Sequence, residues 1–174
     1  MPRLIAAMLL TALLAPLHAQ AGSDPGDAIV VVVVRHAEKA ADDPRDPTLS
    51  EAGQARARAL AATFAGAGLD AVFATQYRRT RLTAAPAAEA AGLDVQVRPI
   101  GPDVAATYDA DLVAEIRALP AGSTVLVVGH SNTVPALVRA FGGVSAEMPE
   151  AEFDRYQVVI VPPQGPVRVL ASRY

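Results

Sequence analysis

The sequence contains no cysteine, and only three of its 174 residues are histidine. Without cysteine the chain can form no disulfide, and it can use neither a cysteine nucleophile nor a cysteine metal ligand. The net charge of -3 comes with no basic block and no acidic tail, so the composition does not indicate nucleic-acid binding. Apolar residues, in contrast, make up 52% of the chain, which indicates a globular protein with a sizeable core.

The N-terminal residues have a pattern of their own. Arg3 is followed by an apolar run up to Leu17 and then by an A-x-A pattern of small residues. This is typical of a secretory signal peptide, and the run is shorter than the roughly 20 residues that span a membrane. We therefore expect a signal peptide over residues 1–21, a flexible lead-in over residues 22–27, and a periplasmic or secreted protein with no stable membrane span after cleavage. An uncleaved membrane anchor is the alternative.

Residues 28–174 are expected to form one domain in which strands and helices alternate. The run over residues 28–34 is apolar throughout and rich in valine, as in a strand that is buried on both faces of a parallel sheet. The pattern therefore predicts an α/β fold, a three-layer α/β/α sandwich with a mostly parallel central sheet. Further strands are expected at 71–74, 93–97, 124–128, 157–161 and 167–170, and helices from Ser50, over 75–91, over 109–119 and up to Phe141.

Charged or polar side chains follow two of the predicted strands. Arg35 and His36 come directly after the first strand, and His130 follows the strand at 124–128. Parallel sheets bind ligands outside the carboxyl ends of their strands, so we expect both histidines to meet in one crevice. Two histidines can also hold zinc, but the adjacent arginines would repel a cation, and no metal is expected.

Three arginines, Arg78, Arg79 and Arg81, lie at the start of the helix expected over residues 75–91. The N-terminus of a helix is its positive end, where cations are unfavourable and anions are favourable. An anionic ligand bound there would explain the arginines. A solvated basic face is the alternative.

Four segments in order resemble the histidine phosphatase superfamily, which includes the cofactor-dependent phosphoglycerate mutases. R-H-A-E at 35–38 resembles the family's R-H-G/A-E motif, and L-S-E-A-G-Q at 49–54 is similar to its L-T/S-x-x-G segment. T-Q-Y-R-R-T-R-L-T-A at 75–84 resembles its S-P-x-x-R-A-x-Q-T-A segment, with Gln-Tyr in place of Pro-Leu. G-H-S at 129–131 resembles the second-histidine motif. The resemblance runs from about residue 29 to residue 137.

The resemblance implies a metal-independent phosphomonoesterase that needs no cofactor. His36 would be the nucleophile that forms a phosphohistidine, and Arg35, Arg79 and His130 would bind the phosphate. A slip of one position in the alignment would exchange Arg79 for Arg78. Because attack needs an unprotonated nitrogen facing the substrate, we expect a backbone carbonyl to hold the other ring nitrogen of His36.

The leaving oxygen also needs a proton donor. Glu38 is the leading candidate for the catalytic acid, and Asp103 and Asp109 are the alternatives. Glu38 has a second reading as the structural partner of an arginine. The mutase branch carries its acid on an insert for which this short chain has little room.

The expected function is therefore that of a small exported histidine phosphatase. Its substrate would be a small phosphorylated metabolite, an envelope glycan or a phosphoprotein; the small members of the family include enzymes that act on phosphohistidine proteins. One alternative is a non-catalytic phosphate-binding or interaction protein on the same fold. The other is a phosphoglycerate mutase, which export disfavours because mutase substrates are cytosolic.

Overall fold

The structure is a computed structural model of the chain, and it describes residues 25–174. The expected signal peptide lies outside the described residues, as does the first half of the expected lead-in. The other half, Pro25–Asp27, forms a 3-10 helix, η1, and the carbonyl of Asp27 accepts a hydrogen bond from the N–H of Gly122. Among the described residues, no helix has the length and apolar character needed to cross a bilayer.

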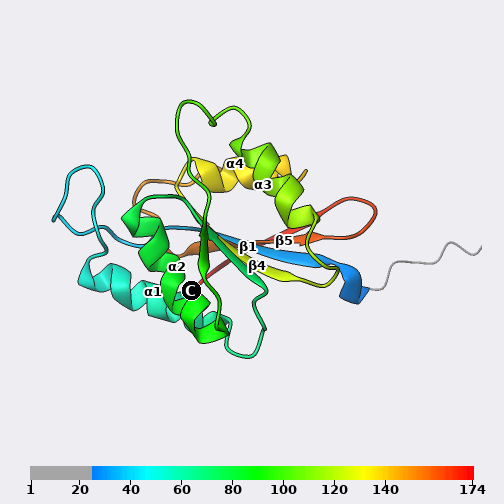
Figure 1. Cartoon of the computed structure of the whole chain (residues 1–174), viewed down its shortest axis with the longest axis horizontal. Coiled ribbons are helices and arrows are strands. Elements are labelled where there is room, and N and C mark those ends of the chain that lie inside the picture. The colour runs from blue at the N-terminus through cyan, green and yellow to red at the C-terminus, as the bar shows by residue number, and fades with distance from the viewer. Residues whose placement is uncertain (1–24) are drawn as a thin grey trace, which may run out of the picture.

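A single sheet forms the middle layer of the described part of the chain (Figure 1). Its strand order is β3-β2-β4-β1-β5-β6. The first four of these strands are parallel, whereas β5 pairs antiparallel with β1 and β6 pairs antiparallel with β5. The expectation of a mostly parallel sheet is thus confirmed. The strands are β1 (Ile29–Arg35), β2 (Ala71–Ala74), β3 (Val95–Val97), β4 (Thr124–Gly129), β5 (Arg155–Val161) and β6 (Arg168–Arg173).

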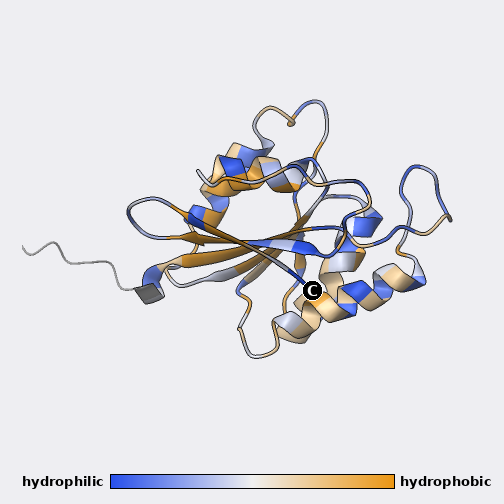
Figure 2. Cartoon of the chain, turned by 180° about the vertical axis from the view of Figure 1, so that it is seen from behind, coloured by the Kyte–Doolittle hydropathy of each residue, from blue (hydrophilic) through white to orange (hydrophobic). Residues whose placement is uncertain are grey.

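Helices cover both faces of the sheet, which confirms the three-layer α/β/α arrangement (Figure 1). α1 and α2 pack on one face, and α3 and α4 pack on the other. Figure 2 shows that hydrophobic residues are concentrated along the strands between these two layers. The helices are α1 (Glu51–Thr63), α2 (Arg78–Ala91), α3 (Tyr108–Arg117) and α4 (Thr133–Ala140).

The valine run of β1 explains why this strand lies inside the sheet. Successive side chains of a strand point to opposite faces. Val31 and Val33 belong to the apolar cluster under α3 and α4, and Val32 and Val34 belong to the cluster under α1 and α2. Because both faces of β1 are buried, the position of its C-terminal end is fixed from both sides of the sheet.

The ends of the helices follow local sequence signals. Ser50 caps α1, and its side chain accepts a hydrogen bond from the N–H of Gly53, as its position predicted. Gly92 ends α2 in the left-handed conformation, with a φ of 69°. α2 begins at Arg78 and not at Thr75 as expected, because the backbone of Tyr77 is extended, with a ψ of 141°.

Gly53 lets α1 approach the loop that follows β1. A Cβ atom at this position would overlap the backbone carbonyl of Glu38. Helix propensity alone predicts that Gly53→Ala stabilises the protein by about 1 kcal/mol. We expect instead a loss of about 1–3 kcal/mol in the free energy of unfolding, because the substitution overpacks this contact. Urea titration measures the change.

Gly101→Ala is the matched control, because a Cβ there meets open space and the residue has no positive φ. Its free energy of unfolding should change by less than about 0.5 kcal/mol. A Gly53→Ala variant as stable as the wild type would show that the approach of α1 to Glu38 is not tight.

Candidate active site

His36 lies just past the C-terminal end of β1 and is buried, with 3% of its surface exposed. Its backbone N–H donates to the carbonyl of Gly129 at 2.9 Å, across the ends of β1 and β4. Its Nδ1 lies 2.8 Å from the carbonyl oxygen of Ala37. Because a carbonyl can only accept, Nδ1 carries the hydrogen and Nε2 keeps a free lone pair. This confirms the expectation that a backbone carbonyl holds the other ring nitrogen.

Burial also keeps the imidazole of His36 neutral. It is the largest influence on the side chain and lowers its pKa from 6.5 to about 4, with further lowering by the positive charges of Arg35, Arg79 and Lys39. The hydrogen bond to Ala37 acts in the opposite direction and is outweighed. At neutral pH, Nε2 is therefore unprotonated, as a nucleophile requires.

His130 lies beside His36, as the strand-end argument predicted. The two ring centroids are 5.4 Å apart, at an interplanar angle of 66°. Nε2 of His130 is 3.0 Å from the hydroxyl of Thr75, and its backbone N–H donates to the Thr133 hydroxyl. Burial, followed by the charges of His36, Arg79 and Arg35, lowers the pKa of His130 to about 3. At neutral pH His130 is thus neutral and has one ring N–H to donate.

Arg35 is the most deeply buried cation of the site, with 2% of its surface exposed. Its Nη1 donates to the backbone carbonyls of Pro149 and Glu150, at 3.1 and 2.6 Å. Its Nη2 forms an ion pair with the Glu150 carboxylate at 2.7 Å. The guanidinium also lies 4.3 Å from the ring centroid of Phe153. No sequence pattern pointed to these partners, which follow α4 and lie more than a hundred residues from Arg35 in the chain.

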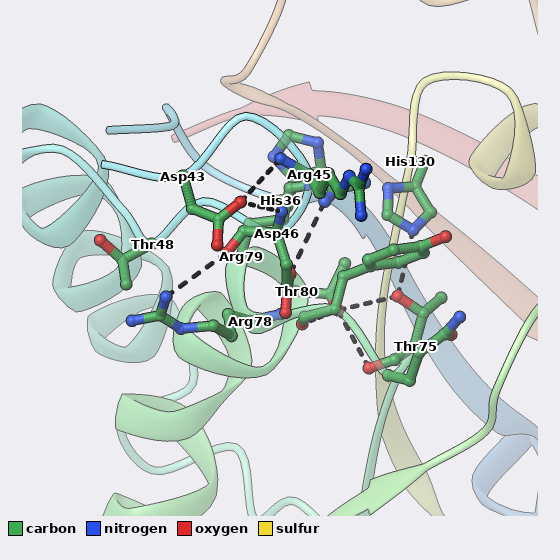
Figure 3. A network of polar contacts seen from close by, with 12 residues as sticks. His36, Asp43, Arg45, Asp46, Thr48, Thr75, Arg78, Arg79, Thr80 and His130 are labelled. Carbon is green, nitrogen blue, oxygen red and sulfur yellow. Dashed lines mark hydrogen bonds and ion pairs between the residues drawn. The ribbon is translucent and has the colours of Figure 1, made fainter. Parts of the chain in front are cut away.

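The structure separates the two adjacent arginines of α2. Arg79 is largely buried, lies 4.3 Å from the ring centroid of Tyr77, and lowers the pKa of both histidines. Arg78 is exposed, and it contacts the loop before α1 through the backbone carbonyl of Asp46 (Figure 3). The geometry therefore favours Arg79 as the arginine of the site, as the motif had suggested.

The hydroxyls of two threonines, Thr83 and Thr75, connect the segments that carry the site residues. The hydroxyl of Thr83 accepts from the N–H of Ala37 at 2.9 Å and lies 2.7 Å from the carbonyl of Arg79, so it ties α2 to the loop that carries His36. The hydroxyl of Thr75, which contacts His130, also lies 2.8 Å from that of Thr80 (Figure 3). Thr75 was not among the predicted site residues, although it occupies the first position of the quoted third motif.

The structure argues against Glu38 as the proton donor. Both of its carboxylate oxygens bind the guanidinium of Arg56, at 2.7 to 2.9 Å. Its hydrogen bonds to Arg56 are the largest influence on the carboxyl and hold its pKa below the usual value. A proton donor needs a raised pKa, so the second reading, a structural partner of an arginine, fits the geometry.

The two alternative acids are not in contact with the histidines. Asp103 is exposed in the segment between β3 and α3. Asp109 lies in the first turn of α3, where burial raises the pKa of its carboxyl and the charge of Arg139 opposes the rise. Among residues 25–174, neither carboxylate forms a hydrogen bond or ion pair with His36 or His130.

The site therefore combines a neutral nucleophilic nitrogen with a positive surrounding. Arg35, Arg79 and Lys39 all act on His36 electrostatically. In the part of the chain that the structure describes, no group of three or more acidic or histidine side chains is arranged to hold a metal ion. Guanidinium forks and an imidazole N–H suit an anion with several oxygens, such as phosphate.

A family model relates this site to known proteins. The model of the histidine phosphatase superfamily (branch 1) matches residues 31–100, which include Arg35, His36 and Arg79. Over these residues the chain is similar to that superfamily. His130 lies outside the matched segment, and the pairing of β4 with β1 is what brings it to His36.

Solved structures share the fold over most of the chain. The protein histidine phosphatase SixA in complex with tungstate has a TM-score of 0.64 and 20% identity, with 83% of this chain and 96% of that chain covered. Mycobacterial glucosyl-3-phosphoglycerate phosphatase Rv2419c with VO3 has a TM-score of 0.63 and 18% identity, with 83% and 98% covered. A putative phosphohistidine phosphatase SixA from Nakamurella multipartitia has a TM-score of 0.54 and 23% identity, with 86% and 98% covered. No curated protein matches the sequence significantly.

The two buried neutral histidines make stability depend on pH. Their pKa values, about 4 and about 3 in the folded protein, lie below the value of 6.5 expected in the unfolded chain. Below about pH 6.5 the unfolded chain binds more protons, so the free energy of unfolding falls by up to about 1.4 kcal/mol per pH unit for each histidine. This stability is fully present above pH 6.5 and is lost as the pH falls toward 4.

Urea titrations between pH 7 and pH 4.5 measure this dependence. A His36→Asn/His130→Asn variant should show a shallower decrease than the wild type, because it keeps the carboxylates but lacks both imidazoles. Equal slopes for the two proteins would contradict neutral burial of the histidines.

Proposed function

We propose that this protein is a histidine phosphatase that hydrolyses phosphomonoesters through a phosphohistidine intermediate on His36. The observation that carries the proposal is the state of the His36 ring: its Nδ1–H is held by the Ala37 carbonyl, and its Nε2 is unprotonated at neutral pH. Such a nitrogen can attack phosphorus, and water can then hydrolyse the phosphohistidine.

The groups around His36 can stabilise the negative charge of the phosphoryl group during its transfer. Phosphoryl transfer depends mainly on positioning and electrostatic stabilisation. Arg35 and Arg79 offer forks of N–H donors to the phosphate oxygens, and His130 adds a ring N–H. Each of these groups is fixed by packing before substrate arrives: Arg35 by backbone carbonyls, Arg79 by the ring of Tyr77 and His130 by the hydroxyl of Thr75.

The structural neighbours support a phosphorylated substrate. SixA and Rv2419c were solved with tungstate and VO3, which are oxyanions of the phosphate type. Their names describe action on phosphohistidine in proteins and on glucosyl-3-phosphoglycerate. For this chain we propose a substrate of the same broad class, a phosphorylated metabolite, an envelope glycan or a phosphoprotein. The signal-like pattern of residues 1–21 supports action in the periplasm or outside the cell.

His36→Ala tests the nucleophile. The variant should lose turnover of p-nitrophenyl phosphate in the presence of EDTA, because no other group in the site carries the attacking nitrogen. It should also lose the acid-labile, alkali-stable label that radiolabelled phosphate leaves on the wild type. The assay is run on protein whose thermal unfolding matches that of the wild type.

Two results would contradict this proposal. A His36→Ala variant that still forms the phosphoenzyme would exclude His36 as the acceptor. A wild-type protein that binds phosphate but turns over none of a panel of phosphomonoesters would favour the non-catalytic phosphate-binding alternative.

The adjacent arginines of α2 provide a matched pair. Arg79→Ala should lower kcat/KM for p-nitrophenyl phosphate by about 10²–10³, the effect of removing one donor to a developing oxyanion. Arg78→Ala should lower it by less than about threefold, because this side chain is exposed and contacts the loop before α1. The reverse order would place Arg78 on the phosphate.

A further inference from the structure

The carboxylate of Glu150 forms an ion pair with Arg35, which is one of the proposed phosphate ligands. Its Oε2 lies 2.7 Å from Nη2 of Arg35, and its other oxygen accepts a hydrogen bond from the hydroxyl of Ser131. The side chain of Glu150 is 78% exposed, whereas that of Arg35 is 2% exposed. An open, solvent-facing carboxylate is therefore bound to a buried cation at the edge of the site.

The carboxylate lies close to several groups of the site. Arg35 and Lys39 stabilise its charge, and the hydrogen bond from Ser131 is the largest influence that lowers its pKa. In turn, the negative charge of Glu150 acts on the imidazole of His130. Glu150 thus occupies a position that phosphate oxygens would share, on the side of the site that is open to solvent.

We propose that Glu150 is the catalytic acid, and that the incoming phosphate releases it from Arg35. The inference rests on the proposed function and supplies the proton donor that Glu38 does not provide. A phosphate dianion competes with the single negative charge of Glu150 for the Arg35 fork. Because the Glu150 side chain is exposed, it can turn away without disturbing the core.

The exchange also makes Glu150 a better acid. Once Arg35 binds phosphate, the carboxylate has lost an ion pair and stands beside a dianion, and a nearby like charge favours its protonated form. Glu38 differs in this respect, because its partner Arg56 is not one of the proposed phosphate ligands and stays bound to it. Of the two carboxylates, only that of Glu150 has an ion-pair partner that substrate would take.

Glu150 takes up a proton from solvent when phosphate displaces it from Arg35, and this proton enters the two chemical steps. In the first step, Nε2 of His36 forms a bond to phosphorus, the ester P–O bond breaks, and the leaving alkoxide takes the proton of the Glu150 carboxylic acid. In the second step, water attacks the phosphohistidine, the P–N bond breaks, and the Glu150 carboxylate takes a proton from that water. Inorganic phosphate leaves, and Glu150 releases its proton to solvent and returns to Arg35 as a carboxylate.

Leaving groups of different basicity test the acid role. A p-nitrophenolate leaves without a proton, whereas the alkoxide of an alkyl phosphate such as glycerol phosphate needs one. In single-turnover experiments we expect Glu150→Gln to slow phosphohistidine formation from the alkyl phosphate by about 10²–10⁴. The slowing with p-nitrophenyl phosphate should be at least about tenfold smaller. Gln keeps the size of the side chain and removes the proton it would transfer.

Asp109→Asn is the matched control, because burial raises the pKa of the Asp109 carboxyl and the sequence had named Asp109 as an alternative donor. It should slow both substrates by a similar factor or neither. A leaving-group-dependent loss in Asp109→Asn and not in Glu150→Gln would overturn the assignment.

Two further outcomes would overturn it. Glu150→Gln could form the phosphohistidine from the alkyl phosphate at the wild-type rate and bind inorganic phosphate more tightly. In that case Glu150 only competes with phosphate for Arg35 and is not the acid. If Glu150→Gln slows both substrates equally, Glu150 positions Arg35 and transfers no proton. These results leave His36 chemistry intact, whereas a wild-type protein that forms no phosphohistidine from either substrate overturns the proposed function as well.

Discussion

The parallel pairing of β1 with β4 is the constraint on which the rest of the site depends. Arg35 lies opposite Gly129 at the last position of the ladder, and the next hydrogen bond, from His36 N–H to the Gly129 carbonyl, continues past it at 2.9 Å. The valines of β1 are buried under helices on both faces, so the strand cannot shift without exposing them. The two histidines that follow these strands are therefore held side by side.

Around this pair, cations are held in place by different kinds of partner. Backbone carbonyls and the Phe153 ring hold Arg35, and the Tyr77 ring holds Arg79, so both guanidiniums have fixed positions beside the histidines. Burial, with a smaller contribution from these charges, lowers the pKa of both imidazoles and keeps the rings neutral. The same positive surroundings thus favour an anionic ligand and help to keep the nucleophilic nitrogen of His36 free of a proton.

The carboxylates near the site fall into two groups. Glu38 is bound through both oxygens to Arg56 and fixes the loop after β1, against which Gly53 of α1 packs. Glu150 is exposed, and its partner Arg35 is itself a proposed ligand of phosphate. An ion pair that substrate leaves intact is structural, whereas one that substrate disrupts changes the charge and the proton affinity of its members during the reaction.

The sequence by itself determined the order of strands and helices, the three-layer fold, the caps at Ser50 and Gly92, and the meeting of His36 with His130. These depend on patterns that are local in the chain, such as an apolar run, a capping residue or the end of a strand. The motif also pointed to Arg79, although a shift of one position in the alignment would have selected the adjacent Arg78. Export and the signal peptide over residues 1–21 stay predictions, since those residues lie outside the described part of the chain.

Only the tertiary structure decided which charges pair. Glu38 and Arg56 are 18 residues apart, and Arg35 and Glu150 are 115 residues apart. No periodicity or short motif links such positions, because their contact depends on how α1 and the segment before β5 pack against the end of β1. Packing therefore separated Arg79 from Arg78, bound Glu38 to Arg56, and brought Glu150 to the arginine beside the nucleophile.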